Sequence, residues 1–191
     1  MCDKIVLDLA SGEGYGSDLL ANYAKQIFGV DIDVETITHA KSKYIRNNLT
    51  FLIGEASHIP LPDNSIDVFV SFETIEHHDK HIEMLNEVKR VLKPDGTLVM
   101  SSPDRYYYSD KPTYKNEFHV KELYYDEFKC LINSFFKRTF FYSQRIFVGS
   151  IIAFDGNMDR YRKPLVMEKY GPSYELTPVY NIVIGTDRND F

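Results

Sequence analysis

An apolar run that ends in a glycine-rich turn constrains this chain more than any other feature. Ile5–Leu9 is the apolar run, it contains Asp8, and glycines follow at positions 12, 14 and 16. A helix-like segment, Ser17–Lys25, comes next. A strand, a tight glycine loop and a helix start bring backbone N–H groups close to a nucleotide-like ligand. The stretch therefore predicts a ligand-binding loop at the end of a first strand.

A second acid follows the next apolar run. Asp31 comes directly after Ile27–Val30 and lies 17 residues beyond Gly14. An acid at the tip of a second strand is placed to bind ribose hydroxyls. The dinucleotide fingerprint requires glycine or alanine three residues after Gly14, where this chain has Ser17. The spacing thus indicates a nucleoside-containing ligand and argues against a dinucleotide.

The pattern Asp-x-x-x-Gly-x-Gly with a downstream acid resembles the first motifs of class I S-adenosylmethionine methyltransferases. Three later stretches resemble the adenine-contact loop, the fourth strand and the helix–turn–fifth-strand segment of that family, in the same order: Gly54–Ala56, Ile59–Phe72 and Arg90–Met100. The resemblance covers roughly residues 4–146. Two positions depart from the family, since Ala10 replaces a usual glycine and Glu55 a more frequent Asp.

This resemblance implies S-adenosylmethionine as the cofactor. The loop backbone would hold its methionine part, Glu55 would contact the adenine amino group, and Ala56 would offer its backbone N–H. The implied cofactor contacts come from the ends of the first four strands: Asp8, Ala10, Ser11, Gly12, Gly14, Asp31, Ile32, Glu55, Ala56 and Phe72.

Strand and helix patterns alternate along the chain, which predicts an α/β fold. The expected architecture is a Rossmann-like, seven-stranded, mostly parallel sheet with helices on both faces, and the resemblance implies that its last strand is antiparallel. The expected strands are Lys4–Leu9, Ile27–Asp31, Thr50–Ile53, Ile66–Phe72, Thr97–Ser102, Arg138–Ile146 and Val179–Gly185. The later helices are expected at Val34–Tyr44, His81–Leu92 and Lys121–Phe135, with a turn at Pro94–Gly96.

The length of 191 residues predicts a single domain over residues 1–191. Two segments, at about residues 103–120 and 147–178, lack a clear period and are expected to be insertions on the substrate side. The helices that such methyltransferases usually carry before the first strand are absent from this sequence. That absence bears on cofactor affinity and activity rather than on the fold.

Acids and histidines gather after the fourth predicted strand. In a helical turn, Glu73, Glu76 and His77 would share one face, and His119 follows the neighbouring fifth strand. These four side chains are candidate ligands for a divalent metal ion, a pattern similar to small-RNA terminal 2′-O-methyltransferases. Without metal, His77 or His119 would act as general base, with Glu73 beside them. A purely structural role is the third interpretation.

Net charge, apolar run lengths and cysteine count limit the kinds of partner and location that we expect. A net charge of −6 argues against general DNA or RNA binding, which needs a basic surface. No apolar run reaches membrane-spanning length and no leader precedes the first strand, so we expect a cytoplasmic protein without membrane insertion. Cys2 and Cys130 form no disulfide framework or metal spacing. The oligomeric state cannot be predicted from this sequence.

Two stretches bear on the methyl acceptor. Leu9–Gly16 and Ser102–Leu123 resemble methyltransferases encoded with bacterial surface-polysaccharide genes. That resemblance implies transfer to a hydroxyl of a sugar, a sugar phosphate or a glycan end. The alternatives are a small-molecule O- or N-methyltransferase with a phenolic, quinone-type or amine acceptor, an RNA-end methyltransferase, and a domain that binds S-adenosylmethionine without activity. Fold alone does not choose among them.

Overall fold

A computed structural model describes residues 3–146, 150–154 and 178–189 of the chain. Its central sheet has the order β3-β2-β1-β4-β5-β8-β6-β7. The strands are β1 (Ile5–Leu9), β2 (Gln26–Asp31), β3 (Leu49–Ile53), β4 (Ile66–Ser71), β5 (Leu92–Pro103), β6 (Arg138–Ile146), β7 (Ser150–Phe154) and β8 (Tyr180–Thr186). The helices are α1 (Tyr15–Ala21), α2 (Val34–Lys43), α3 (His81–Val91) and α4 (Tyr125–Phe135), with short helical turns η1 (Ile75–His77) and η2 (Tyr106–Asp110).

The order of the sheet confirms the predicted Rossmann-like architecture. Strands β1 to β5 pair in parallel, and β8 is antiparallel to both β5 and β6. All seven expected strands are present, and the last one is antiparallel as the resemblance implied. The described residues add an eighth strand, β7, which pairs antiparallel with β6 at the sheet edge. It falls within the 147–178 segment, whose residues 155–177 lie outside the described residues.

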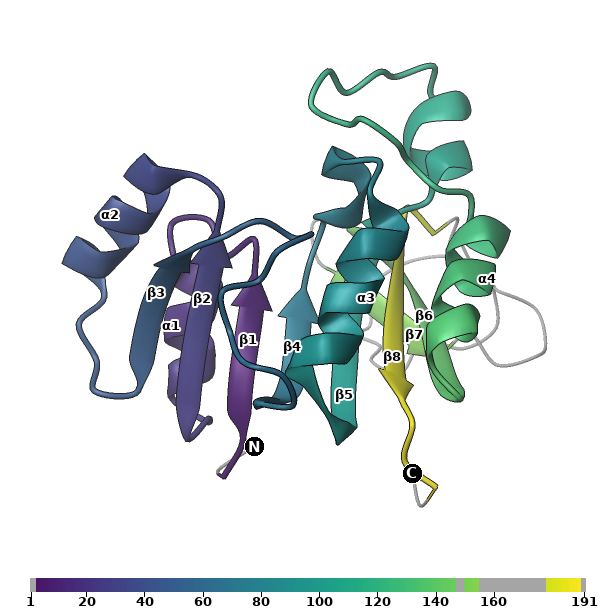
Figure 1. Ribbon diagram of the computed structural model, residues 1–191. Coiled ribbons are helices and arrows are strands. Elements are labelled where there is room, and N and C mark those ends of the chain that lie inside the picture. The colour runs from purple at the N-terminus through teal and green to yellow at the C-terminus, as the bar shows by residue number, and fades with distance from the viewer. Residues whose placement is uncertain (1–2, 147–149, 155–177, 190–191) are drawn as a thin grey trace.

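Helices cover both faces of this sheet (Figure 1). Helices α3 and α4 bury Met84, Leu85, Phe128 and Ile132 in one apolar cluster against the sheet. Helices α1 and α2 bury Ala21, Ile37 and Ala40 in a second cluster with Phe51 of β3. Because each face has its own core, the carboxyl ends of the parallel strands are held at one edge of the molecule, where ligands of open α/β sheets bind.

At two helix boundaries the difference from the sequence prediction has a local reason. Helix α4 begins at Tyr125 rather than Lys121, since the Tyr124 N–H donates to Glu127 Oε2 at 3.0 Å and fixes the first turn there. Helix α3 ends at Val91 rather than Leu92, because the chain is already extended at Leu92, two residues before Pro94.

The expected turn at Pro94–Gly96 lies inside β5. The strand is irregular at this point, where Ile66 pairs with Leu92 and Val68 with Thr97. Helix α3 buries Met84, Leu85 and Val88, whereas Ile82 is 52% exposed.

Candidate functional site

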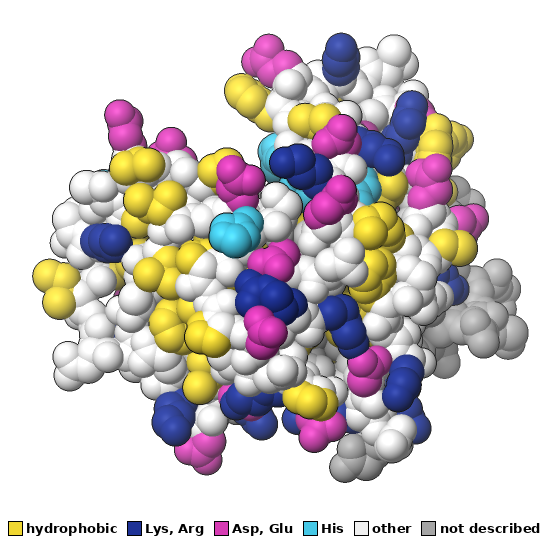
Figure 2. All heavy atoms as spheres, in the orientation of Figure 1, with side chains coloured by type: hydrophobic (Ala, Val, Ile, Leu, Met, Phe, Trp, Pro, Cys, Tyr) yellow, Lys and Arg dark blue, Asp and Glu magenta, His cyan; other side chains and the backbone are white. Residues whose placement is uncertain are grey.

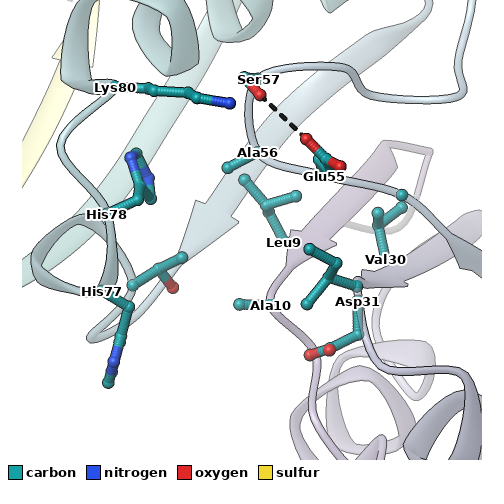
Figure 3. A pocket seen from close by; sticks show the side chains of 13 residues that line it. Leu9, Ala10, Val30, Asp31, Glu55, Ala56, Ser57, His77, His78 and Lys80 are labelled. Atoms are coloured by element: carbon teal, nitrogen blue, oxygen red, sulfur yellow. Dashed lines mark hydrogen bonds between the residues drawn. The ribbon is translucent and has the colours of Figure 1, made fainter. Parts of the chain in front are cut away.

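A cavity of ≈ 500 Å³ lies at the carboxyl ends of the parallel strands. Its walls come from the ends of β1, β2 and β3 and from the η1 segment that follows β4. In Figure 3, Ala10 and Asp31 stand on one side, His77 and His78 on the other, and Glu55 and Ser57 along the third. This volume is in the range of sites for cofactors and other small molecules. The sheet therefore presents a ligand-sized hollow where the sequence placed one.

The glycine loop between β1 and α1 is held in left-handed backbone conformations. Ala10, Gly12 and Gly14 have φ values of 59°, 52° and 86°. A Cβ at Gly14 would stand 2.5 Å from the Phe51 ring, whereas one at Gly12 would meet nothing within 4 Å. Gly14 is thus required for packing, and Gly12 leaves open space beside the loop. Ala10 replaces the glycine usual in the family and adopts a left-handed conformation that favours glycine, so its backbone is strained.

The two acids of the sequence pattern have different surroundings. Asp8 is buried and accepts a 2.6 Å hydrogen bond from Ser17 Oγ, so it ties the strand to the first turn of α1. Burial raises the pKa of Asp8 to about 6, against the lowering effect of the Ser17 bond, and the charge of Asp31 adds to the rise. Asp31 lines the cavity, and its two oxygens accept bonds from the N–H groups of Gly12 and Asp33.

Asp31 therefore fixes the glycine loop and still presents lone pairs to the cavity, since each carboxylate oxygen accepts two bonds. Ala10, Ile32, Glu55 and Ala56, which the resemblance implied as cofactor contacts, also line this space. Glu55 accepts a long bond of 3.3 Å from Ser57 Oγ and is otherwise open to a ligand. These five residues are the part of the expected cofactor set that the structure brings to one cavity.

The other five expected cofactor residues do not line the cavity. Asp8 and Gly14 pack within the loop, and Ser11 and Gly12 belong to it; the Ser11 hydroxyl is buried with no hydrogen-bond partner in the described part of the chain. Phe72 is 52% exposed and lies outside the lining. The sequence also missed Thr74, His78 and Lys80, which do line it. The Glu73–His78 run was the signal for them, but its period did not show which side chains face the cavity.

Beside the cavity, Glu73 and Glu76 are carboxyls with raised pKa values. Glu73 accepts a 2.6 Å bond from Ser101 Oγ, which in turn accepts from the Glu73 N–H. Burial raises the pKa of Glu73 to about 7, and burial followed by the charge of Glu73 raises that of Glu76 to about 8. Glu76 is only 1% exposed, and neither of its carboxyl oxygens has a hydrogen-bond partner among the described residues.

Two histidines converge on Glu76. The rings of His77 and His119 meet edge to face with centroids 5.0 Å apart. One ligand atom each from Glu76, His77 and His119 lie within 4.8 Å of one another. His77 Nδ1 is 3.0 Å from the Phe118 carbonyl oxygen, and His119 Nδ1 is 2.6 Å from Glu122 Oε1. When Nδ1 donates in both rings, both Nε2 atoms are left as electron-pair donors.

The structure thus unites three of the four expected metal ligands and leaves Glu73 outside that group. It adds Glu122, which the sequence did not single out and which orients His119. The Tyr108 ring stacks on the His119 ring at 5.1 Å. Backbone bonds from Val120 and Lys121 to the Glu76 carbonyl bring this segment to η1. Such long-range pairing has no periodic signal in the sequence.

A second cavity, of ≈ 590 Å³, lies in the segment between β5 and α4. His119 forms part of its wall, as His77 does for the first cavity. The histidine pair therefore stands between the two spaces. A third hollow of ≈ 380 Å³ beside η2 is lined by four tyrosines and two aspartates.

Comparison with known proteins agrees with this geometry. Residues 7–100 match the family model described as a methyltransferase domain. A protein of Mycolicibacterium smegmatis with the name "Probable S-adenosylmethionine-dependent methyltransferase" is 40% identical over 119 residues, covering 62% of this chain and 46% of that protein. One of Mycobacterium tuberculosis with the same description is 39% identical over 128 residues, covering 66% and 46%. The chain thus spans about half the length of these curated relatives.

Solved structures share the whole fold. A methyltransferase structure from Thermotoga maritima matches with a TM-score of 0.71 at 18% identity, covering 98% of this chain and 84% of that one. The fold is that of class I methyltransferases. Residues 7–100 are similar to a methyltransferase domain. Among the described residues, no helix has the length and apolar character needed to cross a membrane.

Proposed function

We propose that this protein transfers a methyl group from S-adenosylmethionine to an acceptor hydroxyl. The observation that carries the proposal is the ≈ 500 Å³ cavity, which is lined by Ala10 at the start of the glycine loop, by Asp31 and by the Glu55–Ala56 segment. These are the three elements that the family resemblance assigns to the methionine, ribose and adenine parts. Relatives at about 40% identity carry the same description of activity.

The residues of the cavity fit this cofactor. Asp31 would accept from the ribose hydroxyls, while its bond from the Gly12 N–H keeps the loop in place. Glu55 would accept from the adenine amino group, and Ala56 lies next to it on the same wall. The open space at Gly12 and the unpartnered Ser11 hydroxyl suit the polar methionine end. The cofactor supplies an activated methyl group, so the chain must mainly align an acceptor and remove its proton.

His119 is our candidate general base. Its Nδ1 is held by Glu122, which stabilises the charge that the ring gains when Nε2 takes a proton. Side-chain exposure of His119 is only 7%, so the ring is fixed and shielded. His77 shares the same space, and Glu73 supports the turn through Ser101. We assign these two to positioning the acceptor.

A divalent ion on Glu76, His77 and His119 is the second way in which this site would activate a hydroxyl. The specific observation is that the Glu76 carboxyl is buried with no hydrogen-bond partner among the described residues. An unpaired buried carboxyl is costly, and a cation between it and two imidazoles would remove that cost. Both histidines are also oriented through Nδ1, as metal-ligating histidines usually are.

Chelation separates the two mechanisms. With His119 as a metal-free base, activity is unchanged in excess chelator, and Glu76→Gln retains it. With a metal site, chelator abolishes activity, added Mn²⁺ restores it, and Glu76→Gln abolishes the response to the ion. Glu83→Gln is a matched control, because Glu83 is an exposed residue of α3. Binding of S-adenosylhomocysteine is measured beside each assay to show that the first cavity stays intact.

We propose sugars, sugar phosphates or glycan ends as the acceptors. The tyrosine-lined hollow beside η2 supports this, because tyrosine rings offer apolar faces together with hydroxyls. Other relatives have different named acceptors. An arsenite methyltransferase of Halobacterium salinarum is 31% identical over 104 residues, and a ubiquinone biosynthesis O-methyltransferase of Haemophilus ducreyi is 29% identical over 109 residues. A phenolic or quinone-type small molecule is therefore the second acceptor class.

A panel assay tests the proposal. Release of S-adenosylhomocysteine is followed with sugars, sugar phosphates, catechols and amines as acceptors. Turnover with any hydroxyl compound, lost in Asp31→Ala, supports the enzyme. Tight cofactor binding with no turnover on the whole panel would instead favour a domain that binds S-adenosylmethionine without activity. Turnover confined to amines would contradict the hydroxyl acceptor.

A further inference from the structure

We propose that the second cavity binds an anionic group, a phosphate or a carboxylate, carried by the methyl acceptor. This inference rests on the proposed methyl transfer and adds the chemical class of the acceptor. The cavity has a volume of ≈ 590 Å³ and is built from the segment between β5 and α4. It is large enough for a compound of the size of a sugar phosphate.

More positively charged than negatively charged side chains line this cavity. Three cations, Arg105, Lys115 and Lys121, face two acids, Asp110 and Glu122. Both acids already have partners. Glu122 accepts from Ser109 and contacts His119 Nδ1, and its side chain is only 9% exposed.

Asp110 is the partner of Arg105. Its Oδ1 lies 3.6 Å from Arg105 Nε, and its Oδ2 accepts from the Tyr124 hydroxyl at 2.8 Å. Arg105 also lies over the Tyr124 ring at 5.0 Å. In the described part of the chain, no ion pair joins Lys115 or Lys121 to a carboxylate. The two lysines therefore give this wall its excess positive charge.

The excess is local rather than a property of the whole surface. Figure 2 shows basic and acidic side chains interspersed on the face presented, and the chain as a whole has a net charge of −6. A general polyanion such as nucleic acid therefore meets no extended basic field on this face. A small anion needs only two or three donors in one cavity, and lysine ammonium groups are donors without acceptors.

The position of the cavity connects this charge to the reaction. The Val120 and Lys121 N–H groups donate to the Glu76 carbonyl at 2.8 and 3.0 Å, so the lysine-bearing segment is fixed to η1. His119 lines the same cavity, and its ring stands against His77, which lines the first cavity. An acceptor held by its anionic end at the lysines would place a hydroxyl toward the histidine pair. The two lysines are thus specificity residues for the acceptor.

Titration with inorganic phosphate and with acetate tests the inference on the intact chain. Amide chemical shifts are followed by NMR in the wild type, in Lys115→Gln/Lys121→Gln, and in the matched control Lys41→Gln, which changes an exposed lysine on α2. We expect saturable shifts over residues 105–122. They should weaken by about tenfold per lysine in the double variant, because bonds to charged groups are the strong ones. The control should be unchanged.

The outcomes separate the sources. Binding of phosphate alone supports a phosphorylated acceptor, and binding of both anions supports an acceptor with any anionic group. Shifts that are absent, that lie outside the cavity, or that persist in the double variant would overturn the inference. Binding of S-adenosylhomocysteine is measured on the same samples. If the wild type does not bind S-adenosylhomocysteine, the proposed function is refuted, and the result of the anion titration is interpreted independently of it.

Discussion

Replacement of Asp8 by asparagine should stabilise the protein at neutral and alkaline pH. Asp8 is buried, and its pKa is raised from 3.8 to about 6, chiefly by burial. In the unfolded chain this acid ionises near its ordinary value, so above pH 6 folding must bury a charge. The rise of about two pKa units corresponds to about 3 kcal/mol. Asparagine resembles the protonated acid and still offers an oxygen to Ser17.

The direction of this pH dependence follows from the linkage between protonation of Asp8 and folding. Between pH 3.8 and pH 6 the folded state binds a proton at Asp8 that the unfolded state has released, so the wild type loses stability as pH rises through this window. Above pH 6 the loss is complete. We therefore expect Asp8→Asn to raise the free energy of unfolding by about 2–3 kcal/mol at pH 8 and to have no effect at pH 4.

Urea unfolding followed by circular dichroism at the two pH values measures this difference. Asp95→Asn is the matched control, because Asp95 is an exposed acid on β5 and undergoes the same chemical change. A variant that is less stable than the wild type at pH 8, or a difference independent of pH, would refute the reasoning. The first result would mean that the Ser17 bond to the ionised carboxylate outweighs the effect of burial, and the second that folding does not shift the pKa of Asp8.

Three other replacements have defined outcomes. Ala10→Gly should raise the free energy of unfolding by about 0.5–1 kcal/mol in the same urea assay. Glycine removes most of the left-handed backbone strain at φ 59°, which outweighs the conformational entropy that it adds to the unfolded chain. A loss of stability would contradict this. Gly14→Ala should destabilise by about 2–3 kcal/mol, because its Cβ would stand 2.5 Å from Phe51 at φ 86°; a neutral effect would show that the ring moves aside. Glu122→Gln should lower turnover by about tenfold or more at unchanged S-adenosylhomocysteine affinity, measured by methyl-transfer assay and calorimetry; equal turnover would remove His119 from the reaction.

The fold was predictable because the strands are buried and bounded by clear breaks. Each of the first five strands ends in a turn or an acid, and its apolar run needs no tertiary information to be recognised. β7 was missed because its five residues lie within a segment of glycines and prolines, where pairing with β6 decides the conformation. The late start of α4 depended on the reach of the Glu127 side chain back to the Tyr124 N–H, which sequence period does not register.

The candidate site was predictable to the level of segments. The spacing of Ala10, Asp31 and Glu55 placed all three at strand ends, and the structure brings them to one cavity. Which side chains after β4 face which way was not predictable, because η1 is a single short turn whose orientation depends on bonds from Val120 and Lys121. The same tertiary contact explains why the partnership of Glu122 with His119 was not foreseen.

Calorimetric titration of S-adenosylhomocysteine into this 191-residue chain tests the central claim most directly. The account predicts micromolar binding to the wild type and to Asp95→Ala. In Asp31→Ala, binding should weaken by about 100-fold, because two hydrogen bonds from ribose hydroxyls to a carboxylate contribute roughly 3 kcal/mol. Absence of binding to the wild type, or equal binding to Asp31→Ala, would contradict the assignment of this cavity to the cofactor.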